Sequence, residues 1–263
     1  MNLRAVDHIG GAIAWRALGE GPPILLLHGL GGTRYAWEPQ LEGLADRFRT
    51  IAWDMPGYGD SSPLVPLTFA GIADAIGRLL DQLELERSHI VGLSFGGQQA
   101  IHFALRHPDR VDHLVLADTS HRFGADGTDP EEWKRIRLDA LDAGRTPAEI
   151  AEAVIDSVTG PRFGGIERDR LVAAFGRISS AGLRASIECL PSHNVTDRLG
   201  AITAPTLVIV GELDEETPPG YAETIAAGIP NADLAIIDGV GHLTPSEAPS
   251  DFNRLVADFL DHL

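Results

Sequence analysis

The sequence predicts an α/β protein with a mostly parallel eight-stranded sheet that is covered by helices on both faces. Short apolar segments of strand length alternate with helical patterns along most of the chain, which is typical of parallel strands joined by crossover helices. One segment, 24–27, is apolar at every position, as expected for a strand buried on both faces. The expected strands are 3–6, 13–16, 24–27, 50–53, 89–91, 114–117, 206–210 and 234–237.

Helical patterns fill the intervals between the strands. Residues 69–83 and 95–107 carry apolar side chains at helical spacing, and Pro108 predicts the end of the second helix. Between 120 and 199 the alternation with strands stops. Helices are expected there at 130–143, 147–158 and 168–179.

The chain therefore divides into a core at 1–119, a helical cap at 120–199 inserted after the sixth strand, and the rest of the core at 200–263. Ligands bind at the carboxyl ends of the strands in open α/β sheets. A lobe that leaves the sheet there is expected to cover the site, set substrate choice and exclude water. The alternative is a cap that contributes packing alone.

The composition is that of one catalytic domain. Of the 263 residues, 44% are apolar, which is enough for a single large core. The N-terminus has no apolar signal region and no stretch is suited to span a bilayer, so we expect a cytoplasmic protein. The lone Cys189 cannot form an internal disulfide, which agrees with a reducing compartment. Lys134 is the only lysine, a bias that suggests a GC-rich bacterial genome.

The formal net charge of −17 argues against nucleic acid and anionic membranes as partners, because the field of the protein would repel both. The chain has no His-Glu-x-x-His, paired-cysteine, phosphate-loop or dinucleotide motif. Neither a metal nor an organic cofactor is therefore expected. The expected partner is a small-molecule substrate, with water as the co-substrate, and a homodimer is left open.

The segment after the fifth expected strand has the spacing of a nucleophile elbow, Gly92-Leu93-Ser94-Phe95-Gly96. A serine on a sharp strand-to-helix turn brings the residues two positions before and after it into near contact, so both must be small. The helix that begins at Phe95 leaves backbone N–H groups unpaired near the serine, where they can bind a developing oxyanion. Ser94 is therefore the predicted nucleophile.

An acid and a histidine follow two later strands. Asp214 comes after the strand at 206–210, and His242 comes after the strand at 234–237. A serine hydroxyl needs a base to take its proton, and a carboxylate holds that base in the right tautomer. We assign these roles to His242 and Asp214. The alternative acid is Asp118, after the sixth strand, in which case Asp214 would only cap the next helix.

Together these motifs resemble the α/β-hydrolase superfamily over essentially the whole chain. The resemblance lies in His28-Gly29, in Asp54-Met55-Pro56-Gly57-Tyr58-Gly59-Asp60-Ser61, in the elbow, and in the loops of Asp214 and His242. It implies the α/β-hydrolase fold, with serine, acid and histidine in this chain order. We expect the oxyanion-hole donors to be the backbone N–H groups of Phe95 and Leu30, with Gly31 as the alternative to Leu30.

The C-terminal third resembles the 3-oxoadipate enol-lactonase group. Gly211-Glu212-Leu213-Asp214 precedes Thr217-Pro218-Pro219, and Ala117-Asp118-Thr119 follows the sixth strand, whereas His28-Gly29 departs from that group. The resemblance implies a small ester or lactone substrate from aromatic-compound catabolism, with a carboxylate that Arg122 would bind. The alternatives are a C–C bond hydrolase of the meta-cleavage type, a cofactor-free perhydrolase or haloperoxidase, and a small-molecule receptor.

Several side chains in the loops and the cap are candidates for substrate contact. For each of them, a place in the core or on the solvated surface is the competing interpretation. Leu243 stands where the meta-cleavage group tends to carry tryptophan, which argues against that group. Of the other histidines, His28 is expected to stabilise its own turn. The candidates are Gly29, Trp37, Phe95, His121, Arg122, Trp133, His193 and Leu243.

Overall fold

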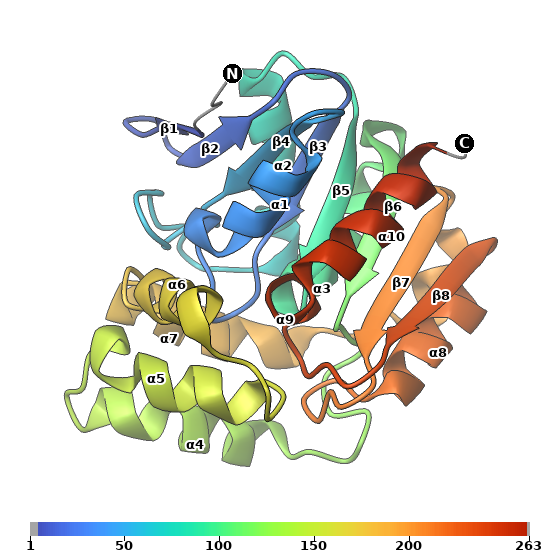
Figure 1. Cartoon of the computed structure of the whole chain (residues 1–263). Helices are drawn as coiled ribbons and strands as arrows, with labels where there is room; N and C mark the ends of the chain where they lie inside the picture. Colours follow the sequence, from blue (N-terminus) through green and yellow to red (C-terminus); the bar gives the residue numbers. More distant parts are fainter. Residues whose placement is uncertain (1–4, 262–263) are drawn as a thin grey trace.

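The eight strands form one sheet in the order β1-β2-β4-β3-β5-β6-β7-β8 (Figure 1), in a computed structural model that describes residues 5–261. β2 pairs antiparallel with β1 and β4, and the other neighbours pair in parallel. The predicted fold class is thus confirmed. The strands are β1 (Val6–His8), β2 (Trp15–Leu18), β3 (Pro23–Leu27), β4 (Arg49–Trp53), β5 (Ser88–Leu93), β6 (Val111–Ala117), β7 (Thr206–Gly211) and β8 (Ala232–Ile237).

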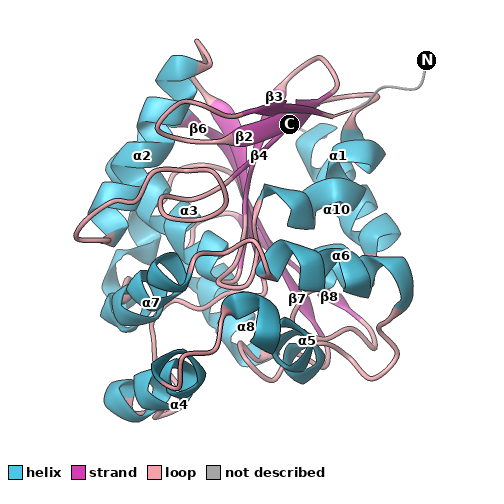
Figure 2. Ribbon diagram, turned by 90° about the vertical axis from the view of Figure 1, so that its left-hand side faces the viewer, coloured by secondary structure: helices cyan, strands magenta, loops and turns pink. Residues whose placement is uncertain are grey.

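Helices connect the strands and cover both faces of the sheet (Figure 2). Six of them belong to the core: α1 (Glu38–Leu44), α2 (Phe69–Gln82), α3 (Phe95–Arg106), α8 (Pro219–Gly228), α9 (Thr244–Glu247) and α10 (Pro249–Asp261). The short 3-10 helices are η1 (Arg34–Trp37), η2 (Pro108–Arg110), η3 (Leu190–Ser192) and η4 (Thr196–Ala201). No helix within residues 5–261 has the length and apolar character needed to cross a membrane.

The central strands place alternate side chains in two apolar layers. In β3, Leu25 and Leu27 pack in the layer that contains α2 and α3, while Ile24 and Leu26 pack in the layer with α1 and α10. Side chains of a strand point to opposite faces in turn, so an all-apolar strand serves both layers. Because β4, β3, β5, β6, β7 and β8 pair in parallel, their carboxyl ends lie at one edge of the sheet.

Four helices lie between β6 and β7 and form the cap at this edge (Figure 1). Their N-termini carry local signals. Asp129 accepts a hydrogen bond from the Glu132 N–H at the start of α4, and Ser179 accepts one from the Gly182 N–H at the start of α7. The cap helices are α4 (Pro130–Asp142), α5 (Pro147–Val158), α6 (Gly165–Phe175) and α7 (Ser180–Cys189).

Four details differ from the sequence-based expectation. β1 and β2 lie two to three residues later than expected, and residues 3–4 of the expected first strand lie outside the described residues. Ala14 is buried for another reason: its N–H bonds to the Ser61 hydroxyl and its carbonyl accepts from the Asp54 N–H. The third cap helix lies at Gly165–Phe175 and not at 168–179, because it ends at Gly176. The fourth, α7, was not expected at all.

Candidate active site

The elbow places Ser94 on a strained turn between β5 and α3. Its φ of 55° and ψ of −118° are unusual for a residue with a side chain. A Cβ at Gly92 would overlap the Gly96 carbonyl, and one at Gly96 would overlap the Leu27 carbonyl, so both positions require glycine. The turn is held by the Ser94 N–H, which donates to the Ala117 carbonyl at 2.8 Å.

Ser94, His242 and Asp214 lie in one chain of hydrogen bonds. The His242 Nε2 lies 2.9 Å from the Ser94 Oγ, and the Nδ1 lies 2.9 Å from both carboxylate oxygens of Asp214. A carboxylate only accepts, so the Nδ1 carries the proton and the Nε2 is free to accept from the serine hydroxyl. The Thr217 hydroxyl donates to the Asp214 Oδ2 at 2.8 Å and helps hold the carboxylate.

Charges around the histidine favour its protonated form. Burial of the His242 ring alone would lower its pKa. The charge and hydrogen bond of Asp214 outweigh burial, and with the charges of Asp118 and Glu216 they raise that pKa to about 9. Burial opposes ionisation of Asp214 as well, but the facing imidazole lowers its pKa below the ordinary value.

Asp118 lies beside this chain but does not contact the imidazole through a hydrogen bond. Its Oδ1 accepts from the Gly211 N–H at 3.0 Å, and its Oδ2 accepts from the Thr244 N–H and hydroxyl at 3.1 and 2.6 Å. Complete burial and the nearby Asp214 charge raise the pKa of Asp118. Its contacts join the ends of the two loops that carry Asp214 and His242.

The backbone N–H groups of the candidate oxyanion donors are unpaired. Within residues 5–261, neither the Leu30 nor the Phe95 N–H donates a hydrogen bond, and the same is true of Gly31. Gly29 lies against the serine, because a Cβ built on it would be 3.3 Å from the Ser94 Cβ. The Leu30 N–H follows Gly29 in the chain and the Phe95 N–H follows Ser94, so both remain candidate oxyanion donors.

The turn at residues 54–61 holds the loop that carries Leu30. The Tyr58 hydroxyl donates to the Leu30 carbonyl at 3.0 Å, and the Met55 N–H donates to the His28 Nε2 at 3.1 Å. The His28 Nδ1 then donates to the Gly29 carbonyl at 2.9 Å. Burial lowers the pKa of His28, so this ring is a neutral structural link.

An ion-pair cluster fixes the next segment of the same loop. The Arg34 side chain is only 2% exposed and pairs with Asp54, Asp60 and Asp7. Its backbone N–H also donates to the Asp54 Oδ1 at 2.8 Å. No local pattern in the sequence marks Arg34, because an arginine in a loop is usually solvated.

The structure does not bring all candidate substrate contacts together. Trp37 is buried in the layer with α1 and α10, where its ring lies 6.4 Å from that of Phe252. The Phe95 side chain packs against the Phe69 ring at 5.6 Å, although its backbone belongs to the elbow. Leu243 is half-buried and contacts both apolar layers.

The remaining candidates lie where the cap joins the core. Arg122 is exposed and pairs through its backbone with Asn194. Trp133 packs against Phe123 with ring centroids 5.2 Å apart. The other two are buried histidines: His121 and His193.

The two buried histidines differ in their hydrogen bonds. The His193 Nε2 donates to the Ser120 carbonyl at 2.9 Å, and its Nδ1 lies 3.1 Å from the His102 Nε2. Burial lowers the pKa of His193 to about 3, so the ring is neutral and its Nδ1 accepts. The His121 Nδ1 is buried without a hydrogen-bond partner among the described residues. These rings link the cap to the core and make no hydrogen bond to Ser94.

The fold and this site define the class of protein. Residues 22–180 match the alpha/beta hydrolase fold family, to which the chain belongs. Among its relatives, a protein named as a carbamate hydrolase, RutD, from Caulobacter sp. (strain K31) is 33% identical, over 90% of each chain. A 2-hydroxy-6-oxononadienedioate/2-hydroxy-6-oxononatrienedioate hydrolase from Pseudomonas putida is 32% identical, over 93% of this chain and 90% of its own. The structure of the enol-lactonase from Burkholderia xenovorans LB400 superposes with a TM-score of 0.86 at 26% identity, over 95% of this chain and 96% of its own.

Proposed function

We propose that the protein is a serine hydrolase that cleaves a small carboxylic ester or lactone. The observation that carries the proposal is the unbroken chain of contacts from the Ser94 Oγ through His242 to Asp214, at 2.9 Å each. In the proposed site, the unpaired Leu30 and Phe95 N–H groups would supply the oxyanion donors that acyl transfer requires.

In this proposal, the Ser94 Oγ attacks the carbonyl carbon while the His242 Nε2 takes the hydroxyl proton. The Leu30 and Phe95 N–H groups stabilise the tetrahedral oxyanion, and removal of one such donor costs about 3 kcal/mol in related chemistry. The intermediate then collapses, and the leaving oxygen takes the proton from the His242 Nε2. Water attacks the acyl-serine in the same way and releases the acid.

The proposed substrate class follows from the site and from the relatives. An ester or lactone carbonyl is the simplest group that this arrangement can attack without a cofactor. The enol-lactonase is named for a lactone substrate, and its fold superposes on this chain over nearly the whole length. A carboxylate on the substrate would contact the cap, where Arg122 is the proposed partner.

The second candidate is hydrolysis of a carbon–carbon bond in a dienoate. The observation that favours it is the relative from Pseudomonas putida, which is named for an acyclic dienedioate substrate. The same serine, histidine and acid would serve both reactions.

The test is the initial rate of hydrolysis by the wild type and by Ser94→Ala over a panel of neutral esters, simple lactones, a carboxylated enol-lactone and a meta-cleavage dienoate. We expect turnover of an ester or lactone that falls by at least about 10³-fold in the variant. Turnover of the dienoate alone would select the second candidate. Turnover that is unchanged in the variant, or no turnover of any compound, would contradict the proposed hydrolase.

The acid is tested by two asparagine variants of the same kind. Asp214→Asn should lower kcat by about 10⁴-fold, because the histidine would lose the partner that sets its tautomer. Asp118→Asn should lower it by less than about tenfold, since Asp118 contacts only backbone and Thr244. The reverse order of the two effects would assign the acid to Asp118.

A further inference from the structure

A single carboxylate, that of Glu247, joins the loop of His242 to the cap. Its Oε2 accepts from the Gly160 N–H at 2.8 Å and from the Gly241 N–H at 3.1 Å. Its Oε1 accepts from the Leu243 N–H at 3.1 Å. Gly160 belongs to the cap, between α5 and α6, whereas Gly241 and Leu243 flank the histidine on either side.

The backbone of the histidine itself also contacts the cap. The His242 N–H donates to the carbonyl of Val158, the last residue of α5, at 3.1 Å. The two segments approach so closely that a Cβ on Gly160 would lie 2.8 Å from the Glu247 Oε2. Three consecutive residues of the histidine loop are thus held either by the cap or by Glu247.

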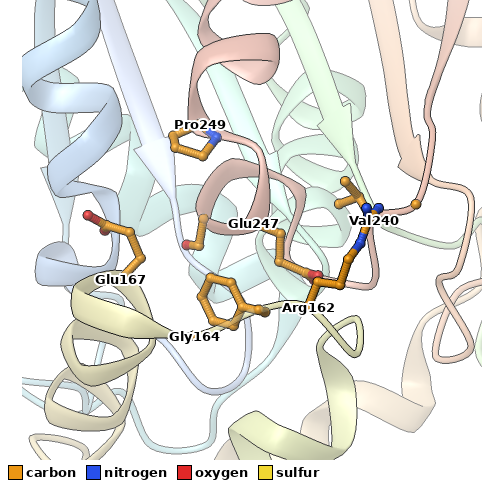
Figure 3. Close-up of a pocket in the computed structure, with 9 residues that line it drawn as sticks. Arg162, Gly164, Glu167, Val240, Glu247 and Pro249 are labelled. Atoms are coloured by element: carbon orange, nitrogen blue, oxygen red, sulfur yellow. The ribbon is translucent and has the colours of Figure 1, made fainter.

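Figure 3 shows Glu247 beside Arg162 of the cap and Val240 of the histidine loop. A cavity of about 430 Å³ lies beside it, lined by both segments. Val240 anchors one end of the loop in the apolar layer with α1 and α10. The hydrogen bonds of Glu247 hold the following residues at the border of the cavity. A carboxylate that accepts three N–H groups is a strong anchor, since bonds to an ionised acceptor are stronger than neutral ones.

We propose that Glu247 is a positioning residue that sets the place of His242 and couples it to the docking of the cap. The inference rests on the proposed serine-hydrolase function. Glu247 does not touch the reacting atoms; it acts through the backbone on both sides of His242. Reacting groups must be placed to within about 1 Å, so a loosened loop costs rate more than it costs substrate binding.

The first variant is E247Q, which keeps the size of the side chain. A glutamine has one acceptor oxygen, so at least one of the three N–H groups would face an amide NH₂ and lose its partner. We expect kcat to fall by tenfold or more, with KM changed by less than about threefold. The pKa of the His242 imidazole, which governs the rate, should fall, because a displaced ring loses its contact with Asp214. The fall is partial, since the charges of Asp118 and Glu216 remain near the ring and still raise its pKa.

The matched control is E167Q. Glu167 lines the same cavity, but its carboxylate accepts from Arg170 at 2.7 Å, and Figure 3 shows its side chain apart from Glu247. E167Q should keep the kcat and pH profile of the wild type. Equal kcat values and pH profiles for E247Q and E167Q would overturn the proposal.

A cap-side variant tests the coupling and serves if E247Q does not fold. G160A leaves Glu247 in place, but its new methyl group would crowd the Oε2 and push the two segments apart. A lower kcat with an unchanged KM is expected. Wild-type kinetics in G160A would refute the coupling to the cap.

A spectroscopic readout separates this proposal from the proposed function. The proton on the His242 Nδ1 should give a downfield proton NMR signal that is missing in Asp214→Asn. In E247Q the signal should shift and titrate at lower pH, whether or not a substrate is known. An unchanged signal would overturn the positioning role, whereas a shifted signal in a protein without Ser94-dependent turnover would refute only the proposed hydrolysis.

Discussion

The His242–Asp214 pair should act in opposite directions on stability and on rate as the pH changes. The pKa of His242 in the folded protein is about 9, above the value of about 6.5 expected for an unfolded histidine. The protonated imidazole therefore stabilises the fold fully below pH 6.5, and this contribution is lost as the pH rises through 9. The neutral ring is the form that can accept the Ser94 proton.

We predict that the stability difference between the wild type and Asp214→Asn shrinks as the pH rises. The net pKa difference of roughly 2.5 units, to which Asp214 contributes the largest increase, corresponds to about 3 kcal/mol at pH 6 and to little at pH 10. Denaturant unfolding at both pH values measures it. Over the same window kcat/KM for a neutral ester should increase. A difference that stays constant or widens with pH would contradict the assignment of the raised pKa to Asp214.

Among the elements, the turn at 54–61 holds the loop that carries Leu30. It holds the Leu30 carbonyl through Tyr58, and it pairs with the buried Arg34 through Asp54. The proposed oxyanion donor Leu30 lies in a loop without regular structure, so its position depends on these side-chain bonds. A buried guanidinium that loses a partner is costly, because the remaining charge cannot return to water.

Asp54→Asn should therefore destabilise the protein by about 2–4 kcal/mol and lower kcat. Denaturant unfolding and ester hydrolysis measure the two effects. Asp7→Asn is the control, because Asp7 pairs with the same arginine but is 35% exposed, and it should cost less than about 1 kcal/mol. Similar losses of stability for the two variants would show that burial of Asp54 does not matter.

The elements that could be predicted are those with a strong local pattern. Buried strands such as 24–27 and the elbow around Ser94 are visible because apolar runs and glycine spacing are local properties. β2 begins later than the pattern predicts, because Ala14 is buried through hydrogen bonds to the turn at 54–61 and not through the sheet. Ser179 as an N-cap, followed by apolar residues at 183, 187 and 190, is the signal that could have found α7.

In the site, the serine, acid and histidine could be proposed because each follows its own strand. Glu247 could not, since its three partners come from two segments about 80 residues apart in sequence and an exposed-looking glutamate after a histidine carries no local signal. Trp37 is a candidate for substrate contact because it is a large aromatic residue, but its position in η1 directs its side chain into the core. The roles of Glu247 and Trp37 depend on contacts between segments that are far apart in the chain, and a single sequence does not show those contacts.

For the whole molecule, the net charge of −17 should affect how a substrate reaches the site. An anionic ester is repelled at low salt, and added salt screens the repulsion over about 10 Å at 0.1 M. We predict that kcat/KM for a carboxylated ester rises about twofold or more between 20 and 200 mM NaCl. A neutral ester of the same size should show no change. A fall with salt would instead indicate that a local cation such as Arg122 dominates.

The hydrogen bond from the His242 N–H to Val158 limits how the cap can be exchanged. A cap from another member of the family, grafted between 120 and 199, would bring its own backbone to this place. Such a graft replaces residues 158–160, and it keeps these contacts only if its own backbone places a carbonyl opposite the His242 N–H and an N–H opposite the Glu247 carboxylate. Chimeras meant to change substrate choice should therefore be cut on both sides of that short segment, so that the native residues stay against the core.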